Sequence, residues 1–376
     1  MKTILFAFLI YLSSCLNLSG QQVLFGEREI DTTDFSFYID NQGMLYPEFR
    51  IENSRIKEAG GNLNSFYAKN STAFDSICTA YSIALTDSYE KRVSMLQEAI
   101  IRQKTLRFIQ PSDICITIMV HGFGKSYDEY PGKINSVLEF SYEKYNLTTN
   151  QLQSDHYISV YWDASFECCF SLNKKRNKEI FGLFEQAQKD AIKAGTAVRA
   201  IISQLPVPVV NIIGHSLGSK VVASALFNLE ESSLPAPLQQ HINIAMVAPA
   251  INGQEVFSHY YQRPPKNYPT QPDNYTLFIL YNEKDYVLKK KDNQLGLFGP
   301  GVKKYGNTAL GCNYKGDAVQ TKDMILSMNP EASVFLQKIT SIGKQHSLIF
   351  YLKADELNPF ISFVNQMIEH VKKDKK

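Results

Sequence analysis

The chain has 376 residues, of which 44% are apolar and 20% charged, so it can bury a sizeable core in one large α/β domain or in two smaller domains. Its 39 basic and 37 acidic residues leave a net charge of +2, which gives no strong electrostatic preference for nucleic acid. Six cysteines are too few for a disulfide scaffold of this size, and no apolar run reaches the roughly 18 residues that a membrane-spanning helix needs. The remaining classes are a globular enzyme and a binding protein.

The amino-terminal segment has the layout of an export signal. Lys2 precedes an apolar stretch from Ile4 to Leu12 and then small residues up to Cys15, which is typical of a secretory signal peptide. The run ending at Cys15 resembles the bacterial lipobox, in which the cysteine is lipidated and becomes the mature first residue; cleavage near Gly20 would instead release an unanchored protein. We expect residues 1–20 to be a signal peptide and the protein to be exported to the periplasm or the outer surface, with membrane attachment if Cys15 is lipidated.

Residues 21–110 predict an extension that packs partly on the core. Two short apolar runs, residues 35–40 and 44–49, flank an Asn-Gln-Gly turn and predict a hairpin, whose second strand Pro47 would restrict to an edge. Further on, apolar residues recur at helical spacing from Phe74 to Ile100 and predict a helix.

Residues 111–376 alternate near-continuous apolar runs with helical patterns. Such runs fit strands that are covered on both faces, and their alternation with helices predicts a mostly parallel sheet with helices on both sides. The predicted strands are residues 114–120, 157–162, 207–213, 242–247, 275–281 and 334–339. Two long segments, residues 253–274 and 289–329, show no clear pattern and are expected to be irregular inserts near the ligand-binding edge of the sheet.

A motif for nucleophilic chemistry follows the third of these strands. Gly214-His215-Ser216-Leu217-Gly218 lies between an apolar strand and an apolar helical pattern, the context that a G-x-S-x-G nucleophile elbow requires. The tight turn lifts the serine hydroxyl clear of the sheet, and its crowded backbone needs glycine at the flanking positions. Ser216 is therefore the candidate nucleophile.

A second turn, His121-Gly122-Phe123-Gly124, follows the first predicted strand of the domain. At this position the backbone N–H of Phe123, together with that of Leu217, would form an oxyanion hole. We interpret His121 as a structural residue of the turn.

A serine nucleophile needs an imidazole to take its proton and an acid to orient that imidazole. Among seven histidines, His346 alone lies in a loop after the last predicted strand and before a closing helix, so it is the candidate base. The acid is expected in the run that follows residues 275–281, with Asp285 preferred and Glu283 as the alternative. Asn252, after the preceding strand, is not an acid.

The chain resembles the α/β-hydrolase superfamily in four places: His121-Gly122, the motif from Gly214 to Gly218, Asp285 and His346-Ser347. The likeness is greatest to a bacterial branch of uncharacterised function. It rests on the strand end at Trp162, the Val247-Ala248-Pro249 run and the spacing from Asp285 to His346-Ser347. At position 252 the branch often carries an acidic residue, whereas this chain has Asn252. The resemblance covers residues 114–368. It implies an α/β-hydrolase fold and hydrolase chemistry without a cofactor or metal, but no particular substrate.

The expected function is that of a secreted or lipid-anchored serine hydrolase that cleaves an ester or related acyl bond through a Ser216-His346-Asp285 triad and an acyl-enzyme. We expect it to bind a small-molecule or lipid-like ester and not to bind nucleic acid. The sequence leaves the oligomeric state open. Two alternatives stay open as well. One is a catalytically silent binding protein on the same fold, and the other is a peptidase, which would differ only in the inserts.

Overall fold

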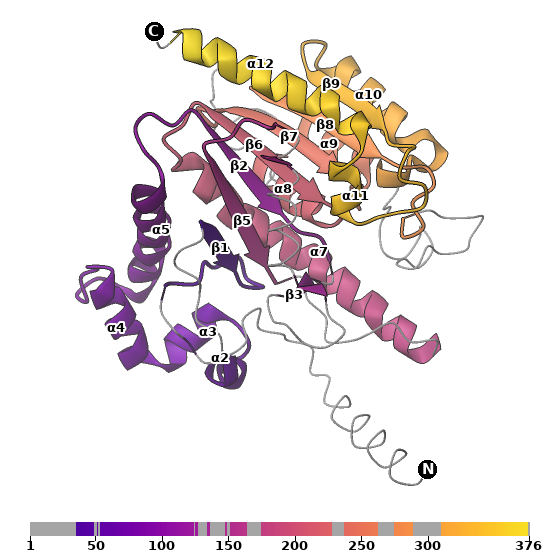
Figure 1. Cartoon of the computed structure of the whole chain (residues 1–376). Helices are drawn as coiled ribbons and strands as arrows, with labels where there is room; N and C mark the ends of the chain where they lie inside the picture. The colour runs from indigo at the N-terminus through magenta and orange to yellow at the C-terminus, as the bar shows by residue number, and fades with distance from the viewer. Residues whose placement is uncertain are drawn as a thin grey trace, which may run out of the picture.

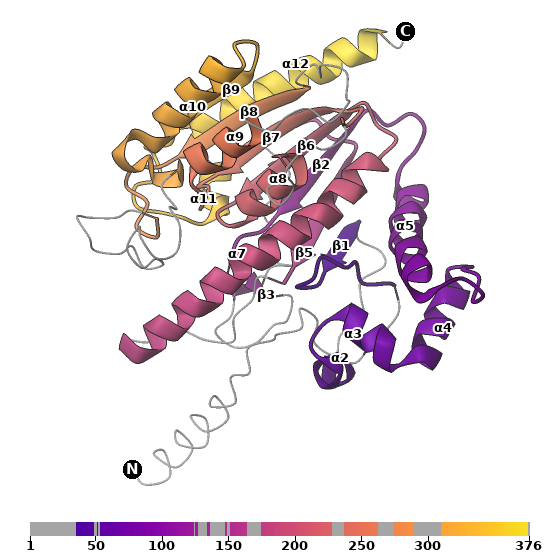
Figure 2. The same cartoon turned by 180° about the vertical axis from the view of Figure 1, so that it is seen from behind.

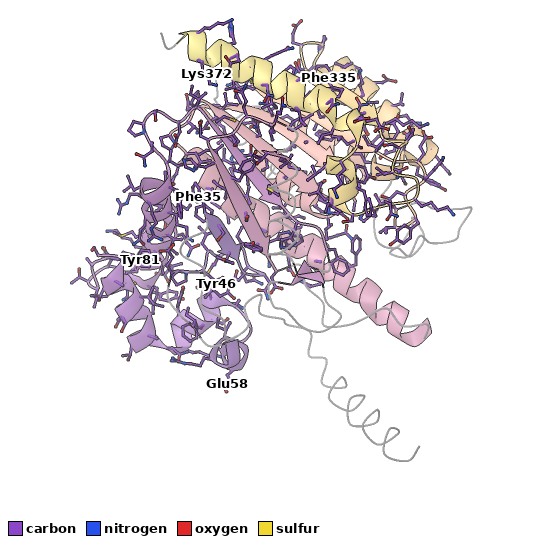
Figure 3. The ribbon with its side chains drawn as sticks, in the orientation of Figure 1. Phe35, Tyr46, Glu58, Tyr81, Phe335 and Lys372 are labelled. Atoms are coloured by element: carbon purple, nitrogen blue, oxygen red, sulfur yellow. The ribbon has the colours of Figure 1, made fainter. Side chains whose placement is uncertain are left out.

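Among the residues that the structure describes, seven strands form one sheet in which every neighbouring pair is parallel (Figure 1). In spatial order they are β1 (Ser36–Ile39), β5 (His156–Trp162), β2 (Cys115–Val120), β6 (Val209–His215), β7 (His241–Val247), β8 (Tyr275–Tyr281) and β9 (Ser333–Lys338). Two short strands, β3 (Lys125–Ser126) and β4 (Ile134–Asn135), pair separately. Phe35 and Phe335, labelled in Figure 3, lie at the two opposite edges of the sheet.

This computed structural model describes residues 35–48, 51, 53–123, 125–126, 134–135, 147–148, 151–163, 174–227, 237–261, 274–288 and 310–374. The expected signal peptide, residues 1–20, and its Cys15 lie outside them.

Helices cover both faces of the sheet, as Figures 1 and 2 show from opposite sides. One face carries α7 (Lys174–Ser203), α8 (Gly218–Phe227) and α9 (Gly253–Tyr261), and the other carries α12 (Asn358–Asp374). Because helices cover both faces, the side chains on both sides of the central strands are buried, and all six residues of β2 are buried. The predicted parallel sheet with helices on both faces is confirmed. No helix in the described part of the chain is both long and apolar enough to cross a bilayer.

The predicted hairpin is only partly formed. A turn closes at Gly43, in left-handed backbone (φ 82°), and the Tyr46 N–H donates to the Tyr38 carbonyl at 2.9 Å. The returning segment contributes only one antiparallel bridge, between Ile39 and Leu45, because Pro47 has no N–H with which to continue a ladder. Instead β1 pairs along its whole length with β5 and becomes an edge strand of the main sheet.

The N-terminal helices form a separate group beside β1 (Figure 1). They are α2 (Asn53–Ala59), α3 (Leu63–Lys69), α4 (Ser71–Ala80) and α5 (Tyr89–Phe108). The single helical pattern predicted from Phe74 to Ile100 is divided between α4 and α5. The division follows from local chemistry, because Ser82 adopts left-handed backbone (φ 57°) and the Ser88 side chain caps the start of α5.

The two inserts that were expected to be irregular each contain a helix. The first begins with α9, whose Glu255 N–H is capped by the Asn252 side chain at 3.3 Å. The second ends with two short 3-10 turns, η1 (Leu310–Cys312) and η2 (Tyr314–Gly316), followed by α10 (Asp317–Met328). Beyond β9 come α11 (Leu348–Leu352), the 3-10 turn η3 (Asp355–Leu357) and α12. The expectation of wholly irregular inserts was therefore wrong.

A buried lysine joins the N-terminal helices to the sheet. Lys104 of α5 is 1% exposed; its Nζ donates to the Ser36 carbonyl at 2.7 Å and lies 3.1 Å from the Glu48 carboxylate. Arg107 binds the same carboxylate through two hydrogen bonds of 3.0 and 2.8 Å. An ion pair taken out of water in this way is stabilising only while both partners remain.

We expect Lys104→Met to lower the free energy of unfolding by about 3 kcal/mol, because it leaves the Glu48 carboxylate and the Ser36 carbonyl buried with fewer donors. Urea denaturation followed by circular dichroism measures the change. Lys91→Met is the matched control, since Lys91 lies on the same helix in an exposed pair with Asp87 and should change stability by less than about 1 kcal/mol. Equal effects of the two variants would contradict the assigned role of Lys104.

Candidate active site

Ser216 lies in the turn between β6 and α8 and has left-handed backbone (φ 52°). This conformation costs a residue with a side chain about 1–2 kcal/mol, so the surroundings must hold it. The Ser216 N–H donates to the Val247 carbonyl at 2.9 Å, and the Ser216 carbonyl accepts from the Ala250 N–H at 3.0 Å. The serine is thereby fixed at the carboxyl edge of the sheet, against the end of β7.

The glycines of the elbow are required by close approach of neighbouring chain segments. A Cβ on Gly214 would lie 2.7 Å from a methyl group of Val222, and a Cβ on Gly218 would lie 2.5 Å from the carbonyl oxygens of Val120 and His121. Any side chain here would push α8 or the end of β2 away from the serine. The predicted elbow residues therefore have the local geometry that the motif demands.

His346 lies in the loop between β9 and α11 and connects the serine to a carboxylate. Its Nε2 is 3.0 Å from the Ser216 Oγ, and its Nδ1 is 2.6 Å from Asp285 Oδ2. Because an ionised carboxylate can only accept, Nδ1 carries the proton, and Nε2 can accept the proton of the serine hydroxyl. Asp285 and Ser216 lie 61 and 130 positions before His346 in the sequence, and the three side chains are joined in one hydrogen-bonded chain.

The Asp285 carboxylate is fully buried and held by several donors. Its Oδ1 accepts from the N–H groups of Val287 and Leu288 at 2.9 and 3.1 Å, and its Oδ2 also accepts from the Tyr351 hydroxyl at 3.3 Å. Burial and the adjacent Asp285 charge raise the pKa of Tyr351 far above its usual range, so the phenol stays protonated and remains a donor. The carboxylate is therefore fixed in orientation toward His346.

Glu283, the alternative acid, points elsewhere. Its carboxylate forms a salt bridge with Lys338 and accepts from the Asn313 side chain at 3.1 Å. The side chain is 41% exposed, whereas that of Asp285 is 0% exposed. Of the two candidate acids, the geometry places Asp285 on His346.

The turn after β2 lies directly against the serine. A Cβ on Gly122 would be 2.9 Å from the Ser216 Cβ. The Trp162 N–H donates to His121 Nε2 at 3.2 Å, so the protonated ring nitrogen is Nδ1, which donates to the Gly122 carbonyl at 2.8 Å. That carbonyl and the Phe123 N–H belong to one trans peptide and point in opposite directions, so the N–H is turned away from His121. Both ring nitrogens of His121 are engaged, in keeping with a structural role.

Leu217 supplies the second expected oxyanion donor. The residue is buried and stands immediately before α8, where helix N–H groups have no partner within the helix. The assignment of an oxyanion hole to Phe123 and Leu217 stays a prediction.

Two side chains around the base were not identified from the sequence as parts of the site. The His215 Nε2 donates to the His346 carbonyl at 2.8 Å, so the residue beside the nucleophile holds the main chain of the base. His215 was assigned only to the elbow motif, and its position next to Ser216 was the available signal. Tyr351 gave no signal, because a buried tyrosine in an apolar helical segment is indistinguishable from an ordinary core residue.

The described part of the chain contains no group of three or more His, Cys, Asp or Glu side chains arranged to hold a metal ion. Two of the histidines outside the site have local side-chain partners. His156 pairs with Asp113 at 2.9 Å, and His241 lies 3.2 Å from the Thr276 hydroxyl.

A parallel sheet covered on both faces, with a serine elbow at its carboxyl edge and a histidine and aspartate from later loops, defines an α/β hydrolase. The chain belongs to the family described as "Alpha/beta hydrolase of unknown function (DUF900)", whose model matches residues 99–291, just over half of the sequence. The matched span includes Ser216 and Asp285 and ends before His346. This membership confirms the predicted superfamily and identifies the chain as a hydrolase in the general sense.

Comparison with solved structures gives a distant match to a candidate cell surface hydrolase from Lactobacillus plantarum WCFS1. The two chains are 14% identical, the alignment covers 68% of this chain and 91% of the other, and the TM-score is 0.32. A search of the curated proteins found no match.

Proposed function

We propose that the protein is a serine hydrolase that cleaves an ester or related acyl bond through a covalent acyl-enzyme. The observation that carries this proposal is the continuous hydrogen-bonded chain from the Ser216 Oγ through His346 to Asp285, with distances of 3.0 and 2.6 Å. A hydroxyl is a weak nucleophile until an aligned base accepts its proton, and this arrangement supplies both the base and the acid that orients it.

In the first half of the reaction the Ser216 oxygen attacks the substrate carbonyl while its proton passes to His346 Nε2. The positive charge that develops on the imidazole is stabilised by the buried Asp285 carboxylate. The negative charge on the tetrahedral intermediate is held by the backbone N–H groups of Leu217 and Phe123. His346 then gives its proton to the leaving group, whose bond to the carbonyl carbon breaks and leaves an acyl-serine.

The second half repeats these steps with water in place of the serine. His346 takes a proton from the water, whose oxygen attacks the acyl carbonyl, and then returns that proton to the Ser216 oxygen as the acid product departs. No redox partner is needed. A small-molecule or lipid-like ester is the proposed substrate class, and the net charge of +2 fits a substrate without strong charge.

We expect a fluorophosphonate probe to label the folded wild-type protein with a stoichiometry near one, because an activated serine displaces the fluoride of the probe and becomes a phosphonyl ester. Intact-protein mass spectrometry measures the mass increase. Ser216→Ala should abolish labelling while leaving the circular dichroism spectrum unchanged. Absence of labelling in the folded wild type would support the alternative of a catalytically silent binding protein.

We expect Asp285→Asn to lower kcat/KM by roughly 10³–10⁴-fold, because an amide at this position no longer favours the Nδ1-protonated tautomer of His346. A series of p-nitrophenyl esters of increasing acyl length provides the assay and also measures chain-length preference. Glu283→Gln is the matched control and should leave kcat/KM nearly unchanged, since Glu283 contacts Lys338 rather than the histidine. A larger loss in the Glu283 variant would overturn the assignment of the acid.

We further propose that the protein is exported and anchored to a membrane through lipid on Cys15. The support is the basic, apolar and small-residue order of residues 1–20. Metabolic labelling of a bacterial expression host with a fatty-acid analogue should mark the wild type, and Cys15→Ser should remove the label. An unlabelled but processed wild type would instead support cleavage near Gly20 and free secretion.

A further inference from the structure

The acid and the base of the site lie on two separate segments that must be held in register. We call residues 282–288, which follow β8 and carry Asp285, the acid turn, and residues 340–347, which follow β9 and carry His346, the base loop. The strands beneath them pair in parallel, and the last main-chain hydrogen bond of that ladder runs from the Ile339 N–H to the Tyr281 carbonyl at 2.8 Å. Beyond it, other contacts must fix the distance between acid and base.

Asn282, the first residue of the acid turn, spans the two segments with one buried amide. The residue is 1% exposed. Its Nδ2 donates to the Gly343 carbonyl at 2.8 Å and to the Gln345 carbonyl at 3.3 Å, while its Oδ1 accepts from the Lys284 N–H at 2.9 Å. Both amide hydrogens thus bind the base loop and the oxygen binds the acid turn, which also fixes which way the amide faces.

We call the hydrogen bonds from Asn282 to the base loop the clamp. Neighbouring hydrogen bonds between the same segments add to it. The Tyr286 N–H donates to the Lys344 carbonyl at 3.3 Å, so three consecutive carbonyls of the base loop, those of residues 343–345, accept hydrogen bonds from the acid turn. The next carbonyl, that of His346, accepts from His215. The carbonyls of residues 343–346 therefore all accept hydrogen bonds from the two segments that carry the acid and the nucleophile.

We propose that Asn282 is a positioning residue, which holds the acid turn and the base loop at the separation that the Asp285–His346 hydrogen bond requires. This inference rests on the proposed function. It differs from a purely local role, because a local Asx turn needs only the Asn282 oxygen and the Lys284 N–H, whereas the two amide hydrogens reach residues 61 and 63 positions away. A shift of about 1 Å between reacting groups lowers catalysis by roughly 10²-fold.

Two substitutions separate the clamp from the local turn. Asn282→Ala removes every bond of the amide. Asn282→Ser keeps an oxygen that accepts from the N–H two residues later, as serine does in turns, but cannot reach the base loop with two donors. Asn252→Ala is the matched control, because Asn252 is also an asparagine in the loop after a central strand, and its side-chain oxygen makes a local cap on the Glu255 N–H at the start of α9.

We expect both Asn282 variants to lower kcat on p-nitrophenyl esters by roughly 10- to 100-fold with little change in KM, and Asn252→Ala to retain wild-type kcat. Assays are run at a temperature where circular dichroism shows each variant folded. If only the alanine variant is impaired and the serine variant matches the wild type, the role is local and the proposal is overturned. Wild-type kcat in both Asn282 variants overturns it as well.

A readout that needs no substrate keeps this test independent of the proposed function. The proton shared by His346 Nδ1 and Asp285 should give a far-downfield line in one-dimensional proton NMR of the wild type, because the hydrogen bond is short and shielded from water. Both Asn282 variants should broaden or lose that line, and Asn252→Ala should keep it. An unchanged line in both Asn282 variants overturns the proposed role of Asn282. A wild-type protein that shows the line but does not hydrolyse esters contradicts only the proposed function.

Discussion

The left-handed backbone at Ser216 is the constraint on which the rest of the site depends. It turns the chain from β6 into α8 within two residues and leaves the hydroxyl at the carboxyl edge of the sheet. The strained turn is held because hydrogen bonds continue from one strand end to the next. The Ser216 N–H binds the end of β7, the Ala248 N–H binds Leu280 at the end of β8, and Ile339 beyond β9 binds Tyr281. Ala248 repeats the left-handed conformation (φ 46°), so two adjacent strands end in the same way.

The three residues of the site differ in how far they are exposed to water. Asp285 is 0% exposed and surrounded by donors, the His346 side chain is 14% exposed, and Ser216 is 8% exposed. Electrostatic interactions are stronger where water is excluded, so the aspartate acts on the histidine at high effective strength. The order in which the strands lie, β6, β7, β8 and β9, brings the elbow, the acid turn and the base loop to one side of the molecule, although the residues are far apart in sequence.

Much of this arrangement could be predicted, because it follows from patterns that act over short distances. Five of the sheet's strands, β2 and β5 to β8, are apolar runs that are largely buried. The elbow is defined by glycines whose neighbours leave no room for a Cβ. Asp285 was preferred over Glu283, but the sequence could not decide between two acids that are two positions apart. Only the contacts of Glu283 with Lys338 and Asn313 hold that side chain away from the histidine. Asn282 stood in the same short run, but its partners are more than 60 residues away.

The role of β1 was missed for a related reason, since a four-residue strand reveals nothing about its partner. Its pairing has a consequence for how the protein is made. Ser36 of β1 pairs with Ser159 of β5, about 120 residues later in the sequence. β1 is therefore synthesised well before the strand with which it pairs. This edge of the sheet therefore cannot form until residue 162 has been synthesised. A pairing between strands so far apart in sequence carries a loop-closure cost in entropy, which slows folding.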